Sequence, residues 1–284
     1  MRNFIIILTG ALVLMTGCTT TKRNNYILLI DNSRSIKPEL MDKYISIMEH
    51  NILPHIGRKD RLTIQFIDEC SMTQSERVFH LDLAKMDFSK TTDGLNHAED
   101  SINARRQRFL TDSIQAMLKN TILQKRAERK SCGSYTDIIN ALKECTSLIC
   151  HDKSYKTTWD KIGNDAQGNE NYEYQNNIII FSDMVNENRE KTLDFTQMGK
   201  FSPEQVYKKL EDLRAINKIP DLSGCNIFIY GATSTAEAGP YANRQIENVR
   251  LFWEIFFKDT GAKIQAYAYD SQREIQEYIL TAAK

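Results

Sequence analysis

Tyr26-Ile-Leu-Leu-Ile-Asp31-Asn-Ser33-Arg-Ser35 is an apolar run that ends in a polar turn. Unbroken aliphatic runs that are too short for a free-standing helix are typical of central strands covered on both faces. The polar turn would then lie at the carboxyl end of that strand, where open α/β sheets bind their ligands. Asp31, Ser33 and Ser35 offer one carboxylate and two hydroxyls, which are hard oxygen donors. This donor set suits Mg²⁺ or Mn²⁺ better than Zn²⁺.

The pattern Asp31-x-Ser33-x-Ser35 resembles the metal-ion-dependent adhesion site of von Willebrand factor A (vWA) domains, which follows their first strand. The family pattern has two further pieces, and both are present here in the same order. Thr136 opens a helical pattern, and Asp183 ends a second buried apolar run. By this resemblance the metal shell would consist of Asp31, Ser33, Ser35, Thr136 and Asp183. The serines would bind the ion directly, and the other residues directly or through water.

One position departs from the family pattern. vWA domains often have glycine after the aspartate of the second strand, and this chain has Met184, which makes the adjoining loop bulkier. Another loop, rich in small residues, leaves the same expected edge of the sheet after a strand at 226–230. Its hydroxyl residues Thr233, Ser234 and Thr235 are candidates for ligand contact, with a flexible connection as the alternative.

The alternation of strands and helices along the chain predicts the fold class. Strands are expected at 26–31, 62–68, 78–83, 177–183, 226–230 and 264–269. Amphipathic helices are expected at 36–52, 99–129, 203–213, 246–256 and 275–279, and after Thr136. Such alternation indicates a parallel sheet wrapped on both sides. We therefore expect an α/β fold: a Rossmann-like, doubly wound, mostly parallel sheet of about six strands flanked by helices, as in vWA domains.

The region from about 85 to 131 is longer than the vWA family usually needs at this point. Its helical pattern, from about Glu99 to Arg129, predicts a long helix or helix pair that embellishes the domain. The expected buried stripe consists of Ile102, Phe109, Leu110, Ile114, Met117 and Leu118. Plain packing is the preferred role, and a partner-docking arm is the alternative. Asp68, which ends a predicted strand, could approach the metal, but we favour a turn or helix-capping role.

The first residues have the features of a targeting sequence. A short positive start precedes an apolar stretch that is too short for an ordinary membrane-spanning helix. It ends in Leu14-Met15-Thr16-Gly17-Cys18, which resembles a bacterial lipobox. We therefore expect a lipoprotein signal peptide at 1–17, a lipidated Cys18 with a short tether at 18–25, and a vWA domain at 26–284. Thr19 after the cysteine favours the outer membrane of a bacterial envelope. An uncleaved anchor or a plain secretory signal is the alternative.

Cysteine and charge composition restrict the remaining possibilities. Besides Cys18 there is an odd number of cysteines, so that at least one is expected to be free or to pair with another chain. A local bridge among Cys132, Cys145 and Cys150 is possible, and their spacing fits no zinc pattern. The formal net charge of the 284 residues is zero, which gives no reason to expect nucleic acid as a partner.

The resemblance implies binding rather than catalysis. A divalent cation, Mg²⁺ or Mn²⁺, held by two carboxylates and neutral hydroxyls would keep a position that an Asp or Glu of a protein partner can complete. The expected function is therefore that of a membrane-anchored, cation-dependent binding domain and not of an enzyme. One alternative is an envelope scaffold that uses helical surfaces without metal. A less favoured alternative is a Mg²⁺-dependent phosphohydrolase with Asp31 as nucleophile, because Ser33 stands where that chemistry needs a second aspartate.

Overall fold

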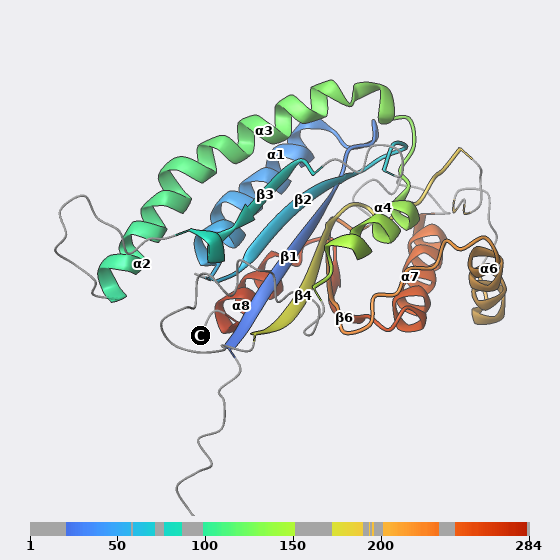
Figure 1. Cartoon of the computed structure of the whole chain (residues 1–284). Coiled ribbons are helices and arrows are strands. Elements are labelled where there is room, and N and C mark those ends of the chain that lie inside the picture. The colour runs from blue at the N-terminus through green and yellow to red at the C-terminus, as the bar shows by residue number, and fades with distance from the viewer. Residues whose placement is uncertain are drawn as a thin grey trace, which may run out of the picture.

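The computed structural model describes residues 21–57, 59–71, 77–86, 99–150, 172–189, 193, 195, 201–232 and 242–282. Within these residues, six strands form one sheet in the order β3-β2-β1-β4-β5-β6 (Figure 1). The strands are β1 (Thr21–Asp31), β2 (Arg61–Ile67), β3 (Phe79–Asp82), β4 (Tyr172–Phe181), β5 (Asn226–Tyr230) and β6 (Lys263–Ala268). All neighbours pair in parallel except β3, which runs antiparallel to β2 at the edge. The predicted α/β fold, a doubly wound and mostly parallel sheet of six strands flanked by helices, is confirmed.

Helices cover both faces of the sheet (Figure 1). One face is covered by α1 (Pro38–Ile47) with its extensions η1 (Met48–Ile52) and η2 (Leu53–His55), by α2 (Glu99–Arg108), η4 (Phe109–Ile114) and α3 (Gln115–Glu128), and by α8 (Gln272–Ala282). The other face is covered by α4 (Ile138–Cys145), α6 (Pro203–Ala215) and α7 (Ala242–Asp259). The short turns are η3 (Leu83–Lys85), η5 (Lys130–Cys132) and η6 (Thr146–Leu148). None of the helices in the described ranges is both long and apolar enough to span a membrane.

The apolar run of β1 is unbroken because both of its faces are buried. Tyr26, Leu28 and Ile30 pack in the core under α1 and α8, whereas Ile27 and Leu29 pack in the core under α4 and α7. All of these side chains are fully inaccessible to solvent. A strand that is covered on both sides has no solvent face on which polar residues could alternate.

The predicted helical excursion is a long helix formed by α2, η4 and α3, which lies beside α1 and β3 (Figure 1). Leu110, Ile114 and Leu118 of the expected stripe are buried, together with Ile122 one turn further on. Met117 is different: its side chain is 48% exposed, because it precedes Leu118 and lies off the buried stripe.

The first strand begins at Thr21, earlier than the expected Tyr26, because its polar start is paired in the sheet. Asn177 on β4 donates to Asn24 on β1 over 3.3 Å, and Asn226 on β5 donates to Asn177 over 3.1 Å. Gln265 on β6 then donates to Asn226 over 2.6 Å. This row of side-chain amides crosses the amino-terminal edge of the sheet. The expected signal peptide at 1–17 and Cys18 lie outside the described residues.

We predict that Asn177→Ala lowers the free energy of unfolding by about 1–3 kcal/mol, because it removes two buried side-chain hydrogen bonds, one to Asn24 and one from Asn226. Urea denaturation measures this loss. The matched control is Asn120→Ala, on the exposed face of α3, which is expected to change stability by less than about 0.5 kcal/mol. Equal effects of the two substitutions would contradict a stabilising role of the amide row.

Candidate metal centre

Segments that are far apart in sequence meet at the carboxyl edge of the sheet. The parallel pairing of β1 with β4 brings the residues that follow both strands to the same edge. The backbone N–H of Arg34 donates to the carbonyl of Gly133 over 2.9 Å, which joins the segment after β1 to the segment before α4. The N–H of Glu187 donates to the carbonyl of Thr136 over 2.8 Å, which joins that segment to the one after β4. All predicted metal ligands lie on these segments.

The two aspartates of the predicted shell are both buried at this edge. Asp31 is fully inaccessible, and Asp183 is 3% exposed. The Oδ1 atom of Asp31 accepts from the N–H of Ser33 over 2.9 Å, and its Oδ2 atom accepts from the hydroxyl of Ser182 over 2.8 Å. Burial, and then the charge of the Asp183 carboxylate, raise the pKa of Asp31 to about 7. Two neighbouring carboxylates out of water disfavour double ionisation unless a cation lies between them.

Hydroxyl groups complete the oxygen-rich edge. The Oγ atoms of Ser33 and Ser35 are 2.8 Å apart, with Ser33 buried and Ser35 exposed. Thr136 is 5% exposed, on the segment that enters α4. The described residues contain no group of three or more His, Cys, Asp or Glu side chains that could hold a metal, so an ion here would depend on two carboxylates together with hydroxyls. This donor set fits a hard divalent cation and does not fit zinc.

Asn186, which is not among the residues predicted from the sequence, fixes the segment that carries Thr136. Its Oδ1 atom accepts from the N–H groups of Ile138 over 2.8 Å and Ile139 over 3.2 Å, so that the loop after β4 caps α4. Asp137 caps the same helix from within by accepting from the N–H of Asn140. No local sequence signal marks Asn186, because the helix that it caps lies 48 residues away.

Met184, which stands where the family often has glycine, is accommodated by its surroundings. Its φ angle is 66°, in the left-handed region that favours glycine. The methionine side chain is fully buried, and the indole N–H of Trp253 donates to its carbonyl over 2.8 Å. The N–H of Met184 donates in turn to Ser182 over 3.0 Å. Packing and hydrogen bonds therefore hold a backbone conformation that a side chain disfavours.

The disulfide differs from the local bridge that was considered possible. Cys70 pairs with Cys132, across a separation of 62 residues, while Cys145, Cys150 and Cys225 are free and buried. The reason is spatial: Cys132 precedes α4 at the carboxyl edge and meets the turn after β2, whereas the helix turns Cys145 into the core. The candidate contact residues Thr233, Ser234 and Thr235 lie outside the described residues.

Comparisons with known proteins add distant structural likenesses. No family model matches the chain, and no curated protein is significantly similar to it. The chain is similar to the TFIIH p34 N-terminal domain, with 13% identity and a TM-score of 0.34, over 90% of this chain and 96% of that one. It is also similar to the open form of the pilus adhesin SpaC from Lactobacillus rhamnosus GG, with 10% identity and a TM-score of 0.35, over 93% of this chain and 30% of that one. At these values neither likeness bears on function.

We predict that Asn186→Ala lowers the free energy of unfolding by about 0.5–2 kcal/mol, because two N–H groups of α4 lose their acceptor. Chemical denaturation measures the change. Ser147→Ala serves as the control: its exposed hydroxyl donates to Glu144 near the opposite end of α4, and its loss is expected to cost less than about 0.5 kcal/mol. A neutral Asn186→Ala would show that the cap does not hold the helix.

The raised pKa of Asp31 predicts a pH dependence for the protein in EDTA. In the unfolded chain an aspartate has a pKa of about 3.9, whereas in the folded chain that of Asp31 is about 7. Between these values the folded state binds more protons, so the stability contributed by Asp31 is full below about pH 4 and is lost as pH rises through 7. Unfolding free energies measured from pH 4 to 8 should show this decline. Asp31→Asn should flatten it, and an unchanged slope in that variant would count against the assignment.

Proposed function

We propose that this chain is a cation-dependent protein-binding domain of vWA type. Asp31, Ser33, Ser35, Thr136 and Asp183 would hold Mg²⁺ or Mn²⁺. The bound ion would supply a Lewis-acidic position that a carboxylate oxygen of the partner can occupy. The observation that carries the proposal is the burial of two aspartates side by side, within reach of hydroxyls and at the meeting point of three segments. A divalent cation is the simplest group that offsets this repulsion.

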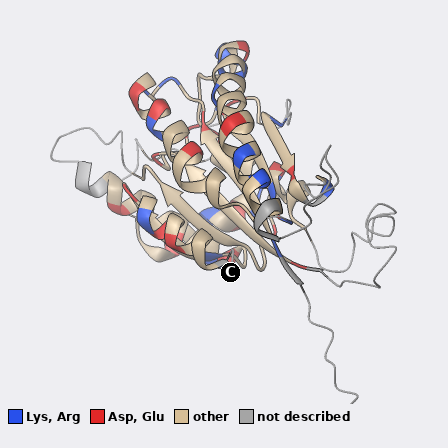
Figure 2. Cartoon of the chain, turned by 90° about the vertical axis from the view of Figure 1, so that its left-hand side faces the viewer, with Lys and Arg blue, Asp and Glu red and all other residues tan. Residues whose placement is uncertain are grey.

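Local charge around the site favours an acidic ligand. Arg34, Lys37 and Lys130 are exposed on the segments that carry or adjoin the candidate ligands. Elsewhere Lys and Arg are interspersed with Asp and Glu along the helices and do not gather into a field of one sign (Figure 2). The cationic side chains at the rim would therefore raise the association rate of a partner with an exposed Asp or Glu.

We also propose that the domain works at a membrane surface. Lipidation of Cys18 would anchor it in a bacterial envelope, with the outer membrane as the expected location. The start of β1 at Thr21 leaves only a short connection to Cys18, so the sheet would lie close to the lipid surface. A short tether would limit the site to partners that come close to that membrane.

The envelope scaffold is the second candidate function. It is favoured by the long helix of α2, η4 and α3, on which Met117 is 48% and Leu123 39% exposed. Exposed apolar side chains on an otherwise charged helix could meet a partner without metal. The two candidates differ in one respect that can be measured, because only the first needs the cation.

We predict that calorimetric titration of the full-length protein with Mg²⁺ or Mn²⁺ shows saturable binding. Asp31→Ala and Asp183→Ala should weaken it by at least about tenfold, because each removes a candidate carboxylate ligand. Asp212→Ala, on the exposed face of α6, is the matched control and should bind like the parent. Absence of binding in the folded parent would overturn the metal site.

The same variants separate the two candidate functions in a capture experiment. The immobilised parent protein is exposed to envelope extract once with Mg²⁺ and once with EDTA. The immobilised Asp31→Ala variant is exposed to the same extract with Mg²⁺. A cation-dependent binding domain loses its partner in EDTA and in the folded variant. Retention of the partner in both would instead support the scaffold.

A further inference from the structure

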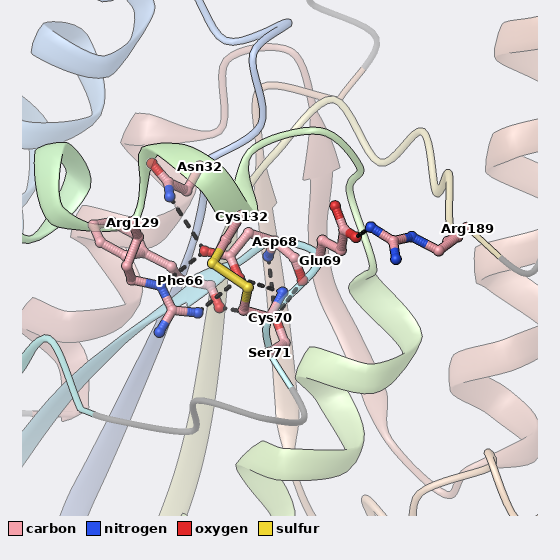
Figure 3. Close-up of a disulfide and its surroundings, with 9 residues drawn as sticks. All are labelled: Asn32, Phe66, Asp68, Glu69, Cys70, Ser71, Arg129, Cys132 and Arg189. Carbon is pink, nitrogen blue, oxygen red and sulfur yellow. Dashed lines mark hydrogen bonds and ion pairs between the residues drawn. A yellow bond between two sulfur atoms is a disulfide. The ribbon is translucent and has the colours of Figure 1, made fainter.

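We propose that the turn after β2, formed by Asp68–Ser71 and here named the β2 turn, positions the metal site, and that its disulfide makes cation affinity depend on redox state. This inference rests on the proposed metal site and concerns its regulation. The β2 turn carries no candidate ligand. It nevertheless contacts every segment that does, as Figure 3 shows.

The Asp68 side chain links the first two segments. Its carboxylate is fully buried and accepts from Arg129, which donates Nη2 to Oδ1 over 2.7 Å and Nε to Oδ2 over 2.9 Å. Its Oδ2 atom also accepts from the side-chain amide of Asn32 over 3.2 Å. Asn32 stands between Asp31 and Ser33, and Arg129 ends the helix that leads towards Thr136. A buried, bidentate ion pair has a fixed geometry, so Asp68 sets the position of both segments.

The next two residues extend the contacts. The N–H of Glu69 donates to the carbonyl of Cys132 over 3.0 Å, and the side chain of Glu69 pairs with Arg189 in the loop after β4. Cys70 is bonded covalently to Cys132. The β2 turn thus reaches the Thr136 segment by an ion pair, a backbone hydrogen bond and a disulfide, and reaches the Asp183 segment by an ion pair (Figure 3).

Ser71 keeps the β2 turn closed. Its hydroxyl accepts from the N–H of Asp68 over 3.0 Å and lies 2.8 Å from the carbonyl of the same residue, to which it donates. Ser71 is 5% exposed. The hydrogen bonds are local, so the shape of the turn does not depend on the metal.

Reduction would remove the covalent part of this arrangement. A dithiol reductant attacks the sulfur of Cys70, which is more exposed than Cys132, and forms a mixed disulfide. The thiolate of Cys132 leaves and takes up a proton, and the second thiol of the reductant releases Cys70. Two electrons and two protons pass from the dithiol, which becomes a cyclic disulfide, to the two cysteines. The Thr136 segment is then held by non-covalent contacts alone. Because cation binding must then order this segment, part of the binding free energy is lost and the cation affinity falls.

The test is Mn²⁺ titration calorimetry on the full-length protein before and after reduction with a dithiol, with thiol titration to verify that the bridge is open. We expect affinity to fall by about twofold to tenfold on reduction, the cost of ordering one or two side chains. The double variant Cys70→Ser, Cys132→Ser should resemble the reduced parent and should not respond to the dithiol, which also excludes chelation of Mn²⁺ by the reductant. Cys150→Ser, at the far end of β2 beside Arg61, should keep the parent's response.

Ser71 offers a second route that leaves the disulfide intact. Ser71→Ala should weaken Mn²⁺ binding by a similar factor, and Ser71→Thr, which restores the hydroxyl, should recover it. If the double cysteine variant does not fold, this pair and the reduced parent still decide the question. A purely structural turn would lower the unfolding temperature in Ser71→Ala without changing the affinity of the folded protein.

The outcomes separate this inference from the proposed function. Equal Mn²⁺ affinity in the oxidised and reduced parent, with the bridge shown to be open, overturns the inference and leaves the metal site standing. No Mn²⁺ binding in the oxidised parent overturns the metal site. Amide hydrogen exchange over residues 129–137 then still tests the positioning: faster exchange on reduction supports it, and unchanged exchange refutes it.

Discussion

The repulsion between two buried aspartates is the constraint on which the carboxyl edge of the sheet depends. Asp31 ends β1 and Asp183 lies just after β4, and the parallel pairing of these adjacent strands brings both residues to the same edge of the sheet. Both side chains are buried: Asp31 is fully inaccessible to solvent, and Asp183 is 3% exposed. The structure supplies hydrogen-bond donors to Asp31 from Ser33 and Ser182. These neutral donors stabilise the Asp31 carboxylate but do not neutralise its negative charge. A bound cation would neutralise it.

The opposite edge of the sheet is just as polar and needs no ion. Side-chain amides of Asn24, Asn177, Asn226 and Gln265 connect one strand to the next. An amide carries both a donor and an acceptor, so a row of amides satisfies itself across parallel strands. Carboxylates are only acceptors when ionised and cannot do so. The amino edge also contains a buried carboxylate, that of Asp60, which accepts from Asn24 and from the N–H of Gly57. The carboxyl edge is the candidate site because the charge of Asp183 there acts on a second buried carboxylate, that of Asp31.

The fold, and the placement of the candidate ligands at one edge of the sheet, could be predicted from the sequence because their signals are local. Each signal lies within a single helix or strand. The three signals are the apolar run before Asp31, the helical pattern after Thr136 and the strand before Asp183. The early start of β1 could not be predicted, because Asn24 and Asn25 are polar and their burial is stabilised by residues 36 to 153 positions away. A polar strand of this kind is indistinguishable in sequence from a tether.

The contacts that escaped prediction share one property: they join segments instead of defining them. Asn186 caps a helix from another loop, and Trp253 holds the carbonyl of Met184. The turn role favoured for Asp68 is present, since its Oδ1 atom accepts from the N–H of Cys70, but its ion pair with Arg129 was not predicted. Each of the unpredicted contacts is a side chain reaching across at least 47 positions of the chain, so no window of sequence contains both partners. A motif identifies which oxygen atoms could bind an ion, but their spacing depends on these long-range contacts. It follows that cation affinity in this chain should be set as much by residues outside the motif as by the ligands themselves.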